Sequence, residues 1–382
     1  MRQNGIRETD IAVIGGGPAG AAIGLELTRG GYSTLVIERS DYRGVRIGET
    51  LPPAVKPLLT SLGVWDQFVA QKHSPAFGIR SVWGGDNLYD NDFIFNPYGA
   101  GWHVDRACFD EMLANCAEQT GVGLYRNARL LSCENGNAGW SIEFADDDGT
   151  HRFRAKFLVD ATGRTSDVAR QQGAKRITGD RLIGVFFFFS LNSGKSAIDD
   201  STLIEAVEDG WWYSAGLPES RLVLAYMTDA DLFARARKQT NFSCLRKLQQ
   251  TKHSRLRVEP YVLTSGPLIV PANSSRLDQS ANGNWLAIGD AAMAFDPLSG
   301  QGVYKALQSA SRAAEAIDQH LTGNTSALAD YSAAINQDFE RYLSTRRRFY
   351  SREQRWPGST FWKRRASGGI TAEDKTLTTL SV

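Results

Sequence analysis

Three glycines near the amino terminus have the spacing of a turn that binds a dinucleotide. The segment GGGPAG places Gly15, Gly17 and Gly20 in the pattern GxGxxG, directly after an apolar run. In such a turn the first glycine permits the tight bend, the second lets the backbone approach a pyrophosphate, and the third lets helix and strand pack closely. Pro18 and Ala19 begin the following helix, whose free N–H groups and positive dipole attract phosphate. These residues therefore predict a pyrophosphate site.

An acidic side chain follows at the position that such a site requires. Glu38 ends the next apolar run, eighteen positions beyond Gly20, and its carboxylate can accept hydrogen bonds from both hydroxyls of an adenosine ribose. The same negative charge would repel the extra phosphate of NADP. Arg39 follows directly and is a further candidate contact to the cofactor. A glycine-rich turn with an ordinary surface glutamate is the alternative interpretation.

Two later segments distinguish FAD from NAD. The chain reads LVDATGR at residues 158–164 and GDAAMAFDPLSGQG at residues 289–302. With the glycine turn, these segments resemble FAD-dependent monooxygenases of the p-hydroxybenzoate hydroxylase superfamily, and more narrowly the branch that includes flavin-dependent tryptophan halogenases. The resemblance implies an α/β fold with a Rossmann-like FAD-binding domain of the GR2 type, an antiparallel β-sheet substrate domain and C-terminal helices.

The resemblance assigns the GD segment to the flavin half of the cofactor. Asp290, directly after Gly289, would hydrogen-bond the ribityl chain. The loop behind it would offer backbone N–H groups to the pyrimidine end of the flavin ring, where negative charge collects on reduction. The residues in that position are Gly300, Gln301 and Gly302. Small residues are needed there because the ring must come close to the backbone.

The resemblance also implies contacts to FAD from a strand end and from two loops. Asp160 and Gly163 match a motif that packs beside the pyrophosphate, and a plain strand-end turn is the alternative. The loop residues fall in the segments RIGET and VDRACFDEML, and they are Arg46, Ile47, Gly48 and Arg106. A guanidinium can pair with phosphate oxygens or lie against a ring. For Arg106, a salt bridge at the start of a helix is the alternative.

Departures from the halogenase pattern indicate which reaction the flavin supports. Ala76 in PAFGIR stands where the halogenases have a lysine, and Ser299 in PLSGQG stands where they have a glutamate. Tyr213 and Ala215 stand where the WxWxIP motif of the halogenases has tryptophans. We therefore expect hydroxylation, in which NAD(P)H reduces FAD and a flavin C4a-hydroperoxide delivers oxygen to an electron-rich ring. A separate reductase is the alternative source of reduced flavin.

Three segments, RIGETLPP, GWWYSAGLP and RWPGSTFW, look most similar to LodB-like flavoproteins. Those proteins mature cysteine tryptophylquinone in amino-acid oxidases by hydroxylating a tryptophan of the partner precursor. The resemblance implies a protein substrate and an aromatic pocket under the antiparallel sheet. The pocket candidates are Glu49, Trp211, Trp212, Tyr213, Pro297 and Ser299. For each aromatic side chain among them, a place in the core of the sheet is an equal alternative.

Two other functions share these motifs. A small-molecule aromatic hydroxylase of secondary metabolism would carry every segment quoted above. A non-catalytic, protein-binding member of the fold would resemble Rab escort and GDP-dissociation inhibitor proteins, although the intact GGGPAG, DATG and GDAA segments argue against it. A wide, basic mouth to the pocket favours a protein substrate, whereas a closed cavity favours a free metabolite.

Composition restricts the partners and the location. A formal net charge of +1 over 382 residues argues against nucleic acid as a partner. The four cysteines show no CxxC spacing and the histidines form no cluster, so we expect reduced thiols, no metal and a cytoplasmic protein without a membrane span. Between residues 341 and 365, nine basic residues accompany one acid. This region predicts either a basic docking surface or arginines that pair with acids elsewhere in the fold.

These candidate residues require two lobes that alternate along the chain. Apolar runs at residues 11–14 and 33–37 flank a helix, so we expect parallel strands joined by a right-handed crossover. A helix at residues 106–119 and aromatic-rich strands at residues 182–227 follow. The expected FAD-binding domain comprises residues 1–75, 106–180 and 276–325, the substrate domain comprises residues 76–105 and 181–275, and residues 326–382 form a C-terminal helical region with a basic patch.

Overall fold

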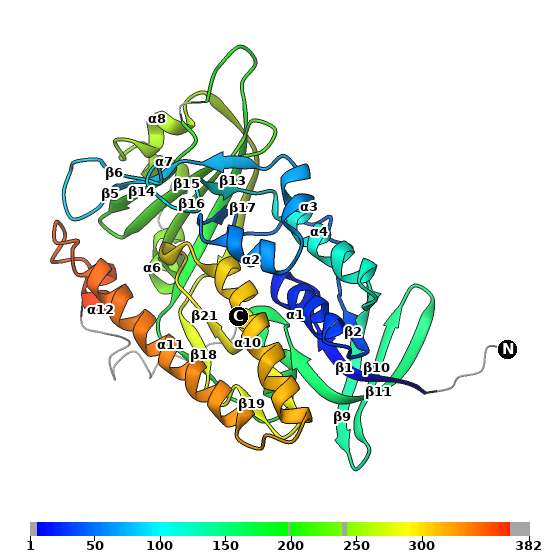
Figure 1. The fold of residues 1–382 in the computed structure, drawn as a ribbon. Helices are drawn as coiled ribbons and strands as arrows, with labels where there is room; N and C mark the ends of the chain where they lie inside the picture. The colour runs from blue at the N-terminus through cyan, green and yellow to red at the C-terminus, as the bar shows by residue number, and fades with distance from the viewer. Residues whose placement is uncertain (1–5, 198, 239–242, 367–382) are drawn as a thin grey trace.

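The computed structural model describes residues 6–197, 199–238 and 243–366, which form two lobes with long helices along one side (Figure 1). The first lobe contains an eight-stranded sheet in the order β19-β20-β11-β1-β2-β8, which β10 and β9 extend from β11. Its strands are β1 (Arg7–Ile14), β2 (Thr34–Ile37), β8 (Gly123–Tyr125), β9 (Arg129–Gly136), β10 (Gly139–Asp146), β11 (Gly149–Asp160), β19 (Ala281–Asn282) and β20 (Trp285–Ala287). The predicted Rossmann-like α/β lobe is confirmed.

The parallel strands of this sheet end together at one edge. Ile14 of β1 is in register with Ile37 of β2 and with Asp160 of β11, and Asp160 is in register with Ala287 of β20. The loops that follow these strands carry the glycine turn, Glu38, the DATG segment and the GD segment. Parallel sheets bind ligands at this carboxyl edge. Segments that lie far apart in the sequence therefore meet at one place.

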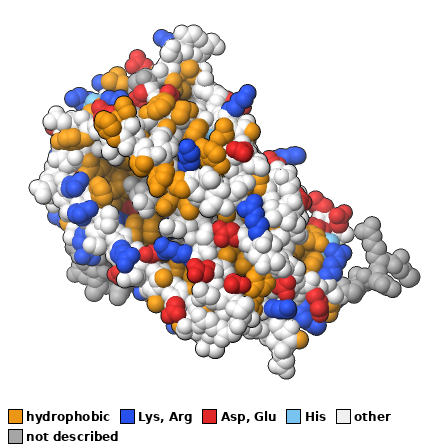
Figure 2. Space-filling view, in the orientation of Figure 1, with side chains coloured by type: hydrophobic (Ala, Val, Ile, Leu, Met, Phe, Trp, Pro, Cys, Tyr) orange, Lys and Arg blue, Asp and Glu red, His pale blue; other side chains and the backbone are white. Residues whose placement is uncertain are grey.

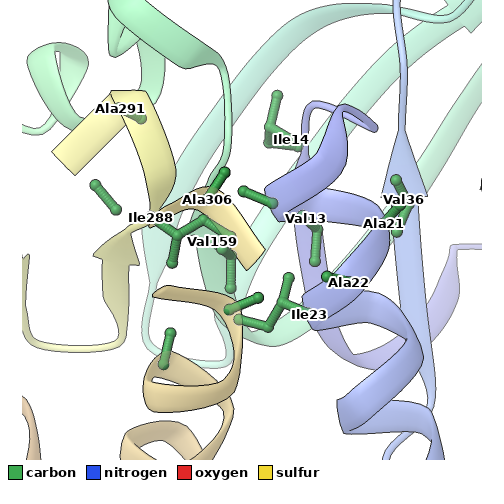
Figure 3. Close-up of a cluster of buried hydrophobic side chains, with 14 of the residues drawn as sticks. Val13, Ile14, Ala21, Ala22, Ile23, Val36, Val159, Ile288, Ala291 and Ala306 are labelled. Carbon is green, nitrogen blue, oxygen red and sulfur yellow. The ribbon is translucent and has the colours of Figure 1, made fainter. Parts of the chain in front are cut away.

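Small side chains let a helix approach the sheet closely. Helix α1 (Pro18–Arg29) packs between α4 (Arg106–Gln119) and α10 (Gly302–Leu321). Figure 3 shows alanine and isoleucine side chains of α1 beside those of β1, β2 and α10, and Ala22 has no exposed surface. Dense packing of this kind leaves the glycine turn at the start of α1 little freedom to move.

The second lobe is a seven-stranded sheet in the order β17-β13-β16-β15-β14-β5-β6. Neighbouring strands are antiparallel, except that β14 and β5 run parallel. The strands are β5 (Gly78–Val82), β6 (Tyr89–Asp92), β13 (Leu182–Leu191), β14 (Thr202–Val207), β15 (Gly210–Leu217), β16 (Arg221–Asp229) and β17 (Tyr261–Pro271). The predicted second lobe with an antiparallel sheet is thereby confirmed, and its role in substrate binding stays a prediction.

Helices cover both faces of the second sheet. Phe186 packs on one face with side chains of the C-terminal helices, whereas Phe187 and Phe189 pack on the other face. Phe186, Phe187 and Phe189 are buried and Phe188 is partly buried, because both faces of the sheet are covered. The covering helices are α6 (Ala230–Arg237), α7 (Cys244–Leu248) and α8 (Ser254–Val258) on one face, and α11 (Ala327–Tyr350) and α12 (Thr360–Ala366) on the other.

Short elements connect the lobes. Two three-stranded sheets comprise β3 (Thr50–Leu51), β7 (Gly101–His103) and β4 (Ser74–Ala76), and β12 (Arg176–Thr178), β18 (Ser275–Leu277) and β21 (Met293–Ala294). The short helices are α2 (Val55–Ser61), α3 (Trp65–Ala70), η1 (Gly163–Thr165), α5 (Asp167–Gln171), α9 (Gly289–Ala292) and η2 (Pro297–Ser299). Within the described ranges, no helix has the length and apolar character to cross a membrane.

Candidate active site

The glycine turn lies at the carboxyl end of β1, and its three glycines have different surroundings. A Cβ atom on Gly15 would lie 2.3 Å from the carbonyl oxygen of Ala161, and Gly15 also has a φ of +106°. A Cβ atom on Gly20 would lie 1.8 Å from the carbonyl oxygen of Gly15. By contrast, a Cβ atom on Gly17 would meet nothing within 4 Å. The protein itself therefore requires glycine at two positions, and Gly17 faces open space beside the start of α1, where Pro18 and Ala19 follow.

Glu38 is tied to the glycine turn. Its Oε2 accepts a hydrogen bond of 2.6 Å from the backbone N–H of Gly16, and its Oε1 accepts one of 3.0 Å from the N–H of Ser40. Only 7% of the residue is exposed, whereas Arg39 is exposed. Glu38 thus joins the ends of β1 and β2, and its contact to a ribose stays a prediction.

Asp160 is turned inward. It has no exposed surface, and its Oδ1 accepts hydrogen bonds from the N–H and the hydroxyl of Thr162, while its Oδ2 accepts one from the N–H of Ala169. Burial raises the pKa of Asp160. This geometry favours the strand-end turn over a direct contact to a cofactor. Gly163, with a φ of +71°, borders open space in the same turn.

Arg46 and Arg106 share one buried acid. Nη1 of Arg46 lies 2.7 Å from Oδ2 of Asp110, and Nε of Arg106 lies 2.9 Å from Oδ1 of the same carboxylate. Arg106 also donates hydrogen bonds to the carbonyl oxygens of Ile47 and Gly48. The structure therefore contains the helix-start salt bridge that was the alternative for Arg106. Both arginines hold the loop at residues 46–48 in place.

Glu49 is a buried acid between the two lobes. Only 3% of it is exposed, and its Oε1 has no hydrogen-bond partner. Burial raises the pKa of Glu49 to about 7, an effect that the nearby Arg106 only partly offsets. The hydroxyl of Tyr213, on β15, lies 2.8 Å from the hydroxyl of Thr50 and near the Glu49 carboxyl. These two pocket candidates therefore meet, although they are far apart in the sequence.

Trp211 and Trp212 lie in the core. Neither has any exposed surface, and they point to opposite faces of the second sheet. The indole N–H of Trp211 donates to the hydroxyl of Tyr350, while Trp212 packs against Tyr226 with ring centres 4.9 Å apart. The suggestion that they wall a pocket is corrected in favour of the core alternative, because helices cover both faces of their sheet.

Asp290 is surrounded by three cations. Nζ of Lys305 lies 2.8 Å from its Oδ1, and Nε of Arg164 lies 3.4 Å from its Oδ2. Arg176 donates a hydrogen bond of 2.8 Å to the backbone carbonyl of Asp290. Burial alone would raise the pKa of Asp290, but Lys305 and Arg164 hold it below its ordinary value. Because 33% of the side chain is exposed, the carboxylate remains accessible to a ligand.

Sequence reasoning missed Lys305. Lys305 is the lysine among the alanines and leucines on the buried face of α10. Charged side chains are rare on such a face unless they are paired, so this position could have indicated an ion pair. Its partner lies fifteen residues earlier, on the other side of the 297–302 segment.

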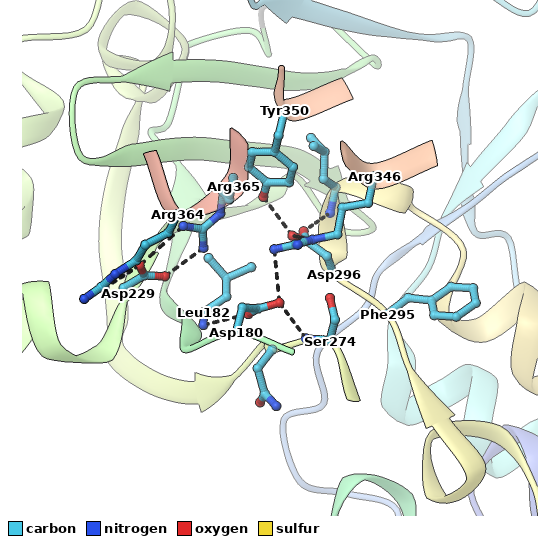
Figure 4. Close-up of polar contacts among 12 residues, drawn as sticks. Asp180, Leu182, Asp229, Ser274, Phe295, Asp296, Arg346, Tyr350, Arg364 and Arg365 are labelled. Carbon is cyan, nitrogen blue, oxygen red and sulfur yellow. Dashed lines mark hydrogen bonds and ion pairs between the residues drawn. The ribbon is translucent and has the colours of Figure 1, made fainter. Parts of the chain in front are cut away.

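The C-terminal helix α11 fixes the loop after the GD segment. Asp296, which is 1% exposed, accepts hydrogen bonds from the backbone N–H of Leu298, from Nε of Arg346 and from the hydroxyl of Tyr350. Figure 4 shows Arg346 reaching Asp180 as well. The loop residues Pro297, Ser299, Gly300, Gln301 and Gly302 begin directly after this anchor and are exposed or partly exposed.

A cavity of about 1000 Å³ adjoins this loop. Ser299 and Gln301 line it together with β5, β6, α10 and α11. Its aromatic lining comprises Trp83, Tyr89, Phe295, Tyr342 and Phe349, and its basic lining comprises Lys305, Arg312, Arg341, Arg346 and Arg352. Figure 2 shows the hollow open to the surface, with hydrophobic side chains above it and Lys and Arg side chains along its lower rim.

The open space at the carboxyl edge suits a large, anionic cofactor. An added Cβ atom would meet nothing within 4 Å at Gly17, Gly163, Gly300 or Gly302. They belong to three loops that the sheet brings together. The cations around Asp290 and the amino end of α1 both favour negative charge there. The described residues contain no group of three or more His, Cys, Asp or Glu that could hold a metal ion.

The parallel sheet, its glycine turn and its GD loop define an FAD-dependent oxidoreductase. Residues 8–342 match the family described as the FAD binding domain, and the chain belongs to this family. The putative FAD-dependent oxidoreductase LodB of Marinomonas mediterranea is 31% identical over 360 residues, which cover 93% of this chain and 96% of LodB. The predicted relationship to LodB-like flavoproteins is confirmed.

Two solved structures share the fold. The peptidyl tryptophan dihydroxylase QhpG, described as essential for tryptophylquinone cofactor biogenesis, superposes with a TM-score of 0.71 at 25% identity, covering 94% of this chain and 79% of QhpG. The myxobacterial chondrochloren halogenase CndH superposes with a TM-score of 0.85 at 21% identity, covering 97% of this chain and 88% of CndH. At that identity the second comparison shows a common fold alone.

Proposed function

We propose that the protein is an FAD-dependent monooxygenase that hydroxylates a tryptophan of a partner polypeptide during the biogenesis of cysteine tryptophylquinone. The observation that carries the proposal is the cavity beside Ser299 and Gln301. Its volume of about 1000 Å³ lies at the upper end of the roughly 300–1,000 Å³ of pockets that enclose a small ligand. Its aromatic walls suit an indole, and the relationship to LodB and QhpG supports the substrate class.

The residues of this chain would bind and orient FAD rather than perform acid–base chemistry. The glycine turn would hold the pyrophosphate, Glu38 the adenosine ribose and Asp290 the ribityl chain. The loop at residues 300–302 would fix the position of the flavin ring relative to the cavity. FAD, once reduced by NAD(P)H, would supply the oxygen chemistry.

The mouth of the cavity favours a polypeptide over a free metabolite. A closed cavity would suit a small molecule that is enclosed on all sides, but this cavity opens to the surface along α11 (Figure 2). A tryptophan on a protein loop needs such an opening, because the chain on both sides of it must leave the site. The small-molecule hydroxylase is therefore the second candidate.

The proposed docking surface is smaller than the sequence suggested. Five C-terminal arginines are paired with acids, namely Arg341, Arg346, Arg355, Arg364 and Arg365. Arg347, Arg348 and Arg352 lie exposed near the end of α11, and Arg352 also lines the cavity. These three residues are the surface that would attract an acidic partner.

Halogenation has less support from the cavity. Ala76 is buried in β4, and Ser299 stands in the cavity wall where the halogenase pattern has glutamate. Lys305 is the lysine among the described lining residues, and its ammonium is held by Asp290. A lysine bound in this way is poorly placed to carry an activated halogen.

The proposal is tested by co-expressing this protein with its candidate partner, the product of the gene that lies next to its own gene. The partner should gain the mass of one or two oxygen atoms on a tryptophan when the wild-type protein is present, as tandem mass spectrometry would show. The Gly17→Ala variant, which keeps the fold but obstructs the open space at the turn, serves as the control and should leave the partner unmodified. An unmodified partner together with hydroxylation of a free indole would support the small-molecule alternative instead.

A further inference from the structure

Lys305 is a buried lysine in the first turn of α10, directly after the loop predicted to face the flavin ring. Its side chain is 6% exposed, and burying an ammonium costs several kcal/mol unless it is paired. Nζ contacts Oδ1 of Asp290 at 2.8 Å, donates to the backbone carbonyl of Met293 and lies 4.7 Å from the ring centre of Phe295. These contacts hold the ammonium in one position between Asp290 and the cavity.

Positive charge exceeds negative charge around this ammonium. Lys305, Arg164 and Arg176 all contact Asp290, which contributes a single carboxylate. Burial lowers the pKa of Arg176 to about 10, and repulsion from Arg164 adds to this effect. Asp160 also attracts Arg176, although the two side chains do not contact each other. A ligand that brings negative charge would offset the excess.

FAD offers two sources of negative charge. The pyrophosphate is charged in every redox state, whereas the flavin ring gains charge only on reduction. A hydride donor transfers two electrons and one proton to the ring, and the ring keeps one negative charge unless it takes up a second proton. The glycine turn after β1 is the predicted site of the pyrophosphate. Lys305, by contrast, follows the 300–302 loop on the same chain segment, which favours the ring.

We propose that Lys305 stabilises the negative charge of reduced FAD and thereby sets how readily the bound cofactor is reduced. The inference rests on FAD binding by this family and on no particular substrate. Lys305 acts as a positioning and electrostatic residue, because Asp290 holds its ammonium in place.

The reduction potential of bound FAD tests this role. Lys305→Gln removes the charge and keeps a donor for Asp290, and Lys305→Arg keeps the charge. In Lys305→Gln we expect reduced FAD to bind at least tenfold more weakly relative to oxidised FAD, which corresponds to a potential about 30 mV more negative for a two-electron couple. Lys305→Arg should keep a potential close to that of the wild type. Arg129→Met, at an exposed position of β9, is the matched control and should leave the potential unchanged.

Two results would overturn the inference. An unchanged potential in Lys305→Gln would show that the ammonium does not act on the reduced ring. If Lys305→Gln weakens the binding of oxidised FAD and of ADP by the same factor, with the potential unchanged, the cation serves the pyrophosphate instead. Lys305→Met, which also removes the donor, repeats the test should the glutamine variant fail to melt cooperatively. The redox titrations use no substrate. If the potential shifts as expected in Lys305→Gln but the wild-type protein does not modify a tryptophan, only the proposed function is contradicted.

Discussion

At the scale of single residues, the glycines of the GxGxxG turn are not equivalent. A Cβ atom on Gly20 would overlap the carbonyl oxygen of Gly15, whereas a Cβ atom on Gly17 would enter open space. Gly17 also has an ordinary φ of −67°, which alanine adopts without strain. The fold thus explains Gly20, whereas the fold does not require glycine at position 17, where we predict that the cofactor approaches the backbone.

This difference predicts opposite effects for two alanine substitutions. Gly20→Ala should destabilise the fold by about 1–3 kcal/mol or more, because the new methyl group overpacks the turn. Gly17→Ala should leave the melting temperature of the FAD-free protein unchanged and weaken FAD binding at least tenfold. Thermal melting and fluorescence titration with FAD measure the two effects. A Gly17→Ala variant that binds FAD normally would contradict the placement of the pyrophosphate at this turn.

Glu49 predicts a pH dependence of stability. Folding raises its pKa from the ordinary 4.5 to about 7, so the folded protein holds this proton more tightly than the unfolded chain does. The contribution of Glu49 to stability is therefore fully present below pH 4.5 and is lost as the pH rises through about 7. Glu49→Gln cannot ionise, so its stability relative to the wild type should increase by up to about 3 kcal/mol between pH 4.5 and pH 8.

Urea denaturation at a series of pH values measures this difference. Tyr213→Phe provides the control, because it alters a neighbour of the carboxyl and leaves the carboxyl itself. A constant difference between Glu49→Gln and the wild type across the pH range would show that the carboxyl is not held neutral by burial.

At the scale of elements, α11 stabilises the 297–302 loop, which we predict to face the flavin. Arg346 of α11 pairs with both Asp180 and Asp296, and the latter caps the short helix at the start of the 297–302 loop. Breaking one partner of a buried ion pair leaves the other charges without compensation. Arg346→Met should therefore destabilise the protein by about 3–5 kcal/mol.

FAD affinity should fall in the same variant, because Asp296 would no longer hold the loop. Arg347→Met, the next residue of the same helix, is exposed and should change stability by less than about 0.5 kcal/mol. Chemical denaturation and FAD titration of the two variants provide the comparison. Equal effects of both substitutions would mean that α11 acts through its net charge and not through the contact with Asp296.

Local patterns explain which elements the sequence could predict. The helix at residues 106–119 has the predicted bounds, because Asp105 caps its first turn through the N–H groups of Ala107 and Cys108. The parallel strands and the glycine turn were also predictable, since their signals are contiguous. Trp211 could not be assigned, because its burial depends on α11 and α12, more than a hundred residues away. Trp212 could not be assigned either, because α6, α7 and α8 of the following segment cover it. The ion-pair partners of Arg346 and Lys305 could not be predicted either, because they lie fifteen or more residues away in the sequence.

At the scale of the whole molecule, the two lobes and α11 enclose a cavity whose lower rim is basic (Figure 2). The chain carries a net charge of only +1, so any attraction for an acidic partner must be local. Rim charges of this kind change association rates and their dependence on salt more than they change the chemistry of the site.

Charge reversal at the end of α11 tests the docking surface. The double variant Arg348→Glu and Arg352→Glu should bind the partner polypeptide at least tenfold more weakly at low salt, and the difference should shrink as salt is added. FAD content should stay that of the wild type. Arg129→Glu, at an exposed position of β9 in the other lobe, is the control. Unaltered binding of the double variant by calorimetry would place the docking surface elsewhere.

We propose that bound FAD transfers oxygen to a tryptophan of the partner. The most direct measurement supplies the purified holoprotein with NADH or NADPH, isotopically labelled O₂, the partner polypeptide and excess bromide, and follows the partner by mass spectrometry. We expect labelled oxygen on a tryptophan and no bromine. Bromination of the partner, or oxygen derived from water, would contradict the proposal.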